Sequence, residues 1–160
     1  MRYLFYCIVS IIVIIFQVTL RNLISIYNIK PDFIIIFLVY LAIVDKRIPV
    51  MFFAFVLGIC EDVASSQLIG LSALTNVIAA FTISSIRKKE IYHFYEPVPY
   101  LFIASLIKTG LAYSILAIGS PLEFWRAIFQ LSLPTIIYTC GIGVIISTLM
   151  PENLWQKNYN

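Results

Sequence analysis

Long apolar runs separated by short polar segments dominate this chain of 160 residues. About 20 apolar residues in a helix cross the hydrocarbon core of a bilayer. The pattern predicts an all-α, multi-pass membrane protein whose residues 1–160 form one domain, a six-helix transmembrane bundle. Its six predicted spans are residues 3–21, 31–45, 48–66, 68–86, 97–118 and 124–149.

Two prolines mark special positions in these runs. Pro31 suits the first turn of a helix, and the positive end of the helix dipole favours the carboxylate of Asp32 beside it. The second helix is therefore expected to begin at this pair. Pro134 lies inside the sixth run and predicts a kink or a division there, with a carbonyl left free near Gln130.

The composition agrees with a membrane protein, because 61% of the residues are hydrophobic and only 12% are charged. The mean hydropathy is +0.97. This composition excludes a soluble fold and places the chain in the lipid bilayer. The formal net charge of +3 is small and scattered, so no nucleic-acid partner is expected.

The basic residues predict an orientation with both termini inside. In this topology the inner side carries more basic residues than the outer side, as the positive-inside rule requires. The inner set is Arg2, Lys46, Arg47, Arg87, Lys88, Lys89 and Lys157, and the outer set is Arg21, Lys30 and Arg126.

Two adjacent carboxylates, Glu61 and Asp62, end the third apolar run. A carboxylate at the centre of a membrane helix costs at least about 2.5–3.5 kcal/mol, so it persists where it faces protein or a watery cavity and finds a partner. Ala54, Gly58 and Asp62 recur every four residues and share one helix face. The small residues on that face admit a close neighbouring helix.

Lys108 is a second intramembrane charge, between Ala104 and Ala112 at the same spacing. Two arrangements are open. In one, Lys108 pairs with Asp62 or Glu61 inside the bundle. In the other, its long stem carries the ammonium to the interface, and the two carboxylates end the third helix among the outer headgroups.

Further polar stripes at helical spacing predict helix packing, since small and hydroxyl residues often join membrane helices. They are Ser72, Asn76 and Ala80 in the fourth run and Thr139, Gly143 and Ser147 in the sixth.

The residues that support catalysis are few. His93 is the only histidine and lies in a predicted loop, and no catalytic triad, zinc motif or phosphate-binding glycine loop is present. Cys7, Cys60 and Cys140 lack Cys-x-x-Cys spacing and are expected to be small buried apolar residues. Neither an enzyme nor a cofactor nor a metal site is expected.

Three motifs in chain order resemble those of the bacterial rod shape-determining protein family MreD. They are Pro31-Asp32 at the second run, Gly58-x-x-x-Asp62 at the end of the third, and Leu68-x-Gly70-x-x-Ala73-Leu74. Ser66-Gln67 departs from the Ser-Gly that the family often has at this turn. The resemblance implies a multi-pass protein of the bacterial inner membrane, with a fold similar to the substrate-binding subunits of energy-coupling-factor transporters.

The resemblance also implies partners. MreC would bind directly, while RodA, its transpeptidase and the actin-like MreB belong to the wider complex. The leading interpretation is a non-enzymatic scaffold that helps to position lateral-wall peptidoglycan synthesis and maintain rod shape. The alternative is a solute-binding or transport subunit with an outward cavity near Glu61, Asp62 and Asn76. The first run lacks the Ala-x-x-x-Ala stripe typical of such subunits, which weighs against transport.

Overall fold

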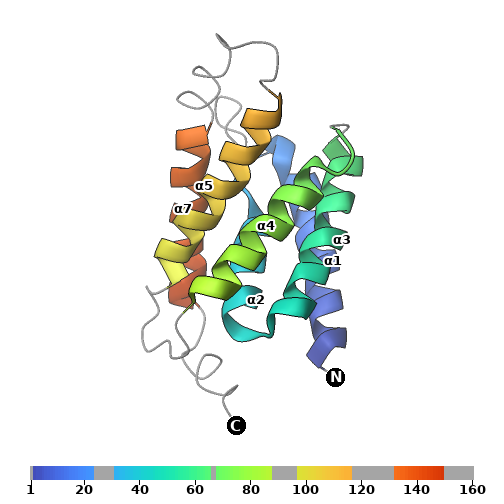
Figure 1. The fold of residues 1–160 in the computed structure, drawn as a ribbon, viewed down its shortest axis with the longest axis vertical. Coiled ribbons are helices and arrows are strands. Elements are labelled where there is room, and N and C mark those ends of the chain that lie inside the picture. Colours follow the sequence, from blue (N-terminus) through green and yellow to red (C-terminus); the bar gives the residue numbers. More distant parts are fainter. Residues whose placement is uncertain (1, 24–30, 66–67, 88–96, 117–131, 150–160) are drawn as a thin grey trace.

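The computed structural model describes residues 2–23, 31–65, 68–87, 97–116 and 132–149 (Figure 1). These ranges contain six helices and no strand, which confirms the prediction of an all-α protein. The helices are α1 (Arg2–Leu23), α2 (Phe33–Val44), α3 (Arg47–Ser65), α4 (Leu71–Ile86), α5 (Pro97–Leu116) and α7 (Leu133–Leu149). Residues 124–131 of the predicted sixth span, Ser66-Gln67 and His93 lie outside the described residues.

Two helices, α3 and α5, are long and apolar enough to cross a membrane. At 1.5 Å per residue the 19 residues of α3 extend about 28 Å, close to the thickness of the hydrocarbon core. The apolar parts of the other described helices are shorter, at 10–17 residues. Passage of all six spans through the bilayer and the inward orientation of both termini stay predictions.

Helix α2 is the short centre of the bundle. It contacts α1, α3, α4, α5 and α7, and nine of its 12 residues are buried. A helix that is apolar on every side is buried on every side, and α2 contains only apolar residues and one tyrosine. In Figure 1, α1 and α3 lie on one side of the bundle and α5 and α7 on the other, with α4 between them.

The amino end of α2 is capped by side chains from three segments. Asp32 is its N-cap residue and accepts the Ile35 N–H at 3.0 Å. Gln17 of α1 accepts the Phe33 N–H at 2.9 Å, and Thr139 of α7 accepts the Asp32 N–H at 3.1 Å. The first N–H groups of any helix lack partners within it, so these contacts fix the entry to α2.

The carboxyl end of α2 is held by one cation. The Arg87 guanidinium, just after α4, donates through Nη1 to the carbonyls of Ala42 at 2.7 Å and Ile43 at 2.6 Å. Positive charge at this end complements the helix dipole. Both ends of α2 therefore depend on residues from other elements.

Pro31 lies just before the start of α2, and Pro134 lies near the first described residue of α7. Pro31 lies before α2, which begins at Phe33, so the predicted start was two residues early because Asp32 acts as the cap. Pro134 is the second residue of the described helix α7. Ser132, just before α7, has π-helical geometry, and the residues before it lie outside the described ranges, so the kink or division predicted at Pro134 stays a prediction. Gln130 lies outside the described residues.

Helices α3 and α4 approach each other closely at a glycine. A Cβ added to Gly58 would lie 2.3 Å from the Ala73 Cα and 2.5 Å from its nitrogen. Ala54 and Asp62, on the same face of α3, are fully buried. The stripe of two small residues and an acid therefore faces α4.

The outward surface is apolar, as lipid contact would require. On α1 it carries large side chains such as Leu4, Phe5, Ile8, Ile11 and Ile15. The prediction that all three cysteines are buried was wrong for Cys7, which is exposed, while Cys60 and Cys140 are partly buried. The reason is that α1 buries only a narrow face, with Tyr6 and Ser10.

We expect Gly58→Ala to destabilise the bundle, because the new methyl group meets backbone atoms that cannot rotate away. Overpacking of this kind costs about 1–3 kcal/mol. The measurement is thermal unfolding of the detergent-solubilised protein. Gly110→Ala is the matched control, since a Cβ at Gly110 meets nothing within 4 Å. Equal unfolding temperatures for the two variants would contradict the close contact.

Candidate functional site

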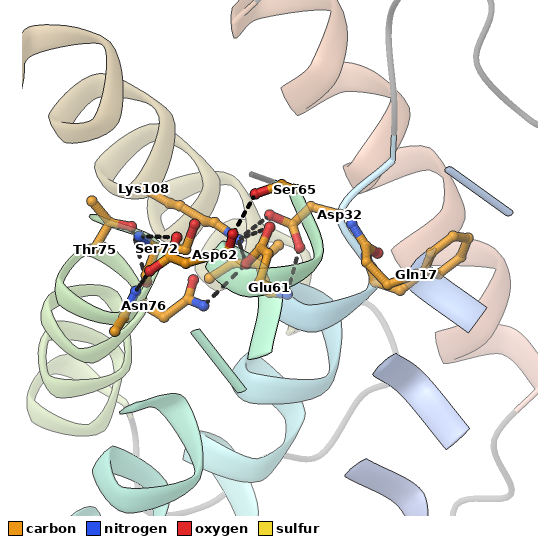
Figure 2. Close-up of polar contacts among 12 residues, drawn as sticks. Gln17, Asp32, Glu61, Asp62, Ser65, Ser72, Thr75, Asn76 and Lys108 are labelled. Carbon is orange, nitrogen blue, oxygen red and sulfur yellow. Dashed lines mark hydrogen bonds and ion pairs between the residues drawn. The ribbon is translucent and has the colours of Figure 1, made fainter. Parts of the chain in front are cut away.

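Polar side chains from α1, α3, α4, α5 and α7, together with the N-cap residue of α2, meet where α3 ends and α2 and α4 begin. Figure 2 shows most of them. We call this group the polar layer. Its members are Gln17, Asp32, Glu61, Asp62, Asn76, Lys108 and Thr139. The layer gathers residues from distant parts of the sequence at one level of the bundle.

Lys108 joins two carboxylates within the polar layer. Its Nζ lies 2.5 Å from Asp32 Oδ2 and 2.9 Å from Glu61 Oε2, with Glu61 Oε1 at 3.2 Å. The Lys108 side chain is only 9% exposed. These ion pairs connect α5 to α3 and to the amino end of α2.

The structure distinguishes among the arrangements that the sequence left open. Lys108 points into the bundle and contacts Glu61, whereas Asp62 takes other partners. The second partner, Asp32, was missed as an ion-pair residue. The sequence did contain a signal for Asp32. Helices that alternate in direction place the start of the second run, with Asp32, on the same side of a membrane as the end of the third run, with Glu61.

Asp62 caps α4 from the neighbouring helix α3. It accepts N–H groups from Gly70 at 2.8 Å, Ser72 at 2.9 Å and Ala73 at 3.4 Å. Gly70, the N-cap residue of α4, has no side chain for this purpose. A carboxylate at this position satisfies otherwise unpaired N–H groups and complements the helix dipole.

Gly70 permits the tight approach to Asp62. Its φ is +99°, a left-handed conformation that glycine adopts without a Cβ penalty. The turn thus aims its N–H at the Asp62 carboxylate while the chain enters α4. Gly58, one helical turn before Asp62, admits the same segment at close range.

Asn76 extends the polar layer to the interior of α4. Its Nδ2 lies 3.4 Å from Glu61 Oε2, and the residue is fully buried. Its Oδ1 has no hydrogen-bond partner among the described residues. Asn76 is therefore the one described member of the layer with an unsatisfied buried acceptor.

The predicted site residues fall into three groups: those of the polar layer, those at the contact between α3 and α4, and the two prolines. Asp32, Glu61, Asp62, Gly70, Asn76 and Lys108 come together in or beside the polar layer. Ala54 and Gly58 line the contact between α3 and α4, Pro31 precedes α2, and Pro134 stands in the first turn of α7.

Sequence reasoning missed Gln17 and the capping role of Thr139. Gln17 is a lone amide inside an apolar run, which is the signal that could have found it. Thr139 belonged to a predicted packing stripe, but its partner could not be named because the two positions are 107 residues apart.

The chemistry available to the polar layer is that of fixed charges. Asp62 is bound by backbone N–H groups, and Asp32 and Glu61 share the Lys108 ammonium. No group of His, Cys, Asp and Glu side chains in the described ranges is arranged to hold a metal ion. The arrangement suits the positioning of helices against one another.

We expect Lys108→Met to destabilise the fold by about 3–5 kcal/mol, because two carboxylates lose their buried cation. Size-exclusion yield and thermal unfolding in detergent measure the effect. The triple variant Lys108→Met with Asp32→Asn and Glu61→Gln should recover most of the loss, since it removes the charges together. A stable single variant would show that the ion pairs contribute little.

Asp62→Asn should be milder than Asp62→Leu, since asparagine keeps one acceptor for the start of α4 and leucine keeps none. Loss of a helix cap costs about 0.5–2 kcal/mol. Hydrogen–deuterium exchange of the amides of residues 70–73 should accelerate strongly in the leucine variant and slightly in the asparagine variant. Equal acceleration in both would assign the effect to the charge and not to the cap.

Comparison with known proteins identifies the family. A search of curated proteins and one of solved structures find no significant match to the chain. The predicted similarity to energy-coupling-factor subunits consequently stays a prediction. The family described as rod shape-determining protein MreD matches residues 1–155, nearly the whole sequence. The chain belongs to the MreD family, whose members act in rod shape determination.

Proposed function

We propose that this protein is a non-enzymatic membrane scaffold of the bacterial cell-elongation machinery. Family membership supplies the role in rod shape determination. The observation that supports a scaffold is that every charged group of the polar layer has partners within the chain, since Lys108 pairs with Asp32 and Glu61 and backbone N–H groups bind Asp62. Such a layer stabilises one arrangement of helices, which is what a docking platform needs.

The proposed direct partner is MreC. Through it the protein would help to position lateral-wall peptidoglycan synthesis by RodA and its transpeptidase, alongside the MreB filament. The proposed location is the bacterial inner membrane, crossed several times, with both termini inside. The apolar outward faces of α1 and α3 are suited to lipid and to the membrane segment of a partner.

Rigidity supports this proposal in physical terms. Interfaces form at lower entropic cost when the binding surface is already ordered. Here the central helix α2 is capped at both ends by other elements, and α5 is tied to α2 and α3 by Lys108. The surface helices are thus held in a fixed register before a partner arrives.

One observation favours the alternative, a solute-binding subunit similar to those of energy-coupling-factor transporters. Asn76 Oδ1 is buried beside Glu61 without a partner among the described residues, and buried acceptors normally have one. A bound polar solute would satisfy it. Co-purification of a small molecule with the wild-type protein, lost in Asn76→Leu, would support this alternative.

Depletion of the protein in a rod-shaped host should give rounded or widened cells, because elongation loses its organiser. The Lys108→Met variant should fail to restore rod shape and should recover less MreC in affinity purification. The triple variant with Asp32→Asn and Glu61→Gln should restore both, if the layer serves only stability.

Two results would contradict this proposal. Normal cell shape combined with lost uptake of one nutrient would favour transport. A triple variant that is stable and abundant but fails to restore shape would show that the charges themselves have a function beyond stability.

A further inference from the structure

Three of the described side chains at the end of the bundle opposite the polar layer are cations. Lys46 and Arg47 lie where α2 passes into α3, and Arg87 follows α4 and contacts the last turn of α2. One carboxylate, Asp45, is also present and is buried, with its Oδ1 accepting the Lys46 N–H at 2.6 Å. Three positive charges and one negative charge give these four described side chains, which we call the basic end, a net charge of +2.

The two arginines are positioned by contacts that do not neutralise them. Arg87 is held by Nη1 alone, through the carbonyls of α2, and its Nε and Nη2 have no partner among the described residues. The Arg47 guanidinium lies over the Phe81 ring, 5.0 Å from its centroid. This contact covers one face of the guanidinium and leaves its N–H edges available for hydrogen bonds.

The contrast with the polar layer is informative. There, carboxylates surround the single cation Lys108. At the basic end, neither the Lys46 ammonium nor the Arg47 guanidinium has a carboxylate partner within the described part of the chain, and both residues are exposed. Arginines that are ordered but unneutralised can bind an anion without first losing side-chain freedom.

The expected position of Arg47 across the bilayer indicates which anion it can contact. Arg47 is the first residue of α3, a helix whose length matches the hydrocarbon core, so it lies at the level of the lipid headgroups. Its neighbours Ile48 and Phe81 are 81% and 45% exposed. Cations directly beside exposed apolar side chains match an amphiphile, which carries a charged headgroup and acyl chains.

We propose that Lys46, Arg47 and Arg87 form a binding site for the phosphate of an anionic phospholipid. The guanidinium fork matches phosphate oxygens in geometry as well as charge. The exposed Phe81 and Ile48 contact the acyl chains of the same lipid. An inorganic phosphate or an acidic soluble protein would leave these apolar side chains uncovered.

Native mass spectrometry of the full-length protein in a neutral detergent tests this site, with phosphatidylglycerol and phosphatidylcholine as probes. The test variant is Lys46→Gln with Arg47→Gln. The matched control is Lys46→Arg with Arg47→Lys, which exchanges the two side chains and keeps both charges. Each basic residue near an anionic lipid surface contributes a factor of about five in affinity.

The glutamine pair should therefore weaken phosphatidylglycerol binding roughly 25-fold and leave phosphatidylcholine binding unchanged. The exchanged pair should bind nearly as the wild type does. Thermal unfolding confirms that each variant is folded, and Arg47→Gln alone gives the same test if the pair is unstable.

Three results would overturn the proposal. Equal affinity of the wild type for the two lipids would exclude an anion-specific site. Displacement of phosphatidylglycerol by millimolar inorganic phosphate would identify a site for the free anion. Unchanged lipid binding by the glutamine pair, with loss of a soluble acidic protein partner, would assign the basic end to protein contact.

Discussion

The structure depends on satisfying the two ends of a short helix that the other helices surround. At 12 residues, α2 extends about 18 Å, well short of the hydrocarbon thickness. Backbone groups left unpaired in such a setting cost several kcal/mol each. Gln17, Asp32 and Thr139 satisfy one end, and Arg87 satisfies the other.

The same requirement explains why charge is concentrated at two levels. Asp32 caps α2 and also forms an ion pair with Lys108, so one carboxylate binds both a backbone N–H group and the ammonium. Asp62 likewise caps the amino end of α4. The buried carboxylates are thus part of helix termination, and the contact between α3 and α4 depends on close packing, as at Gly58 against Ala73.

Much of the fold could be predicted from the sequence, because apolar runs of this length have few alternatives to helices. The close approach of α3 to α4 was predictable from the spacing of Ala54, Gly58 and Asp62. The partner of Lys108 was predictable only as one of two neighbouring acids. At helical pitch, adjacent residues point about 100° apart, so rotation of α3 decides between them.

Other features were beyond sequence reasoning for a physical reason. The burial of α2 on all sides depends on how five other helices surround it. Its caps join positions up to 107 residues apart, and no local pattern encodes such a pairing.

The cap that Asp62 supplies to α4 has a consequence for biogenesis. The partners of the Asp62 carboxylate are N–H groups of residues 70–73, which are synthesised after α3. The penalty on α3 alone is removed only when the turn and the first residues of α4 arrive. If both helices cross the bilayer, insertion of α3 and α4 together as one hairpin would remove this penalty, whereas the partner of Glu61 is supplied only by α5.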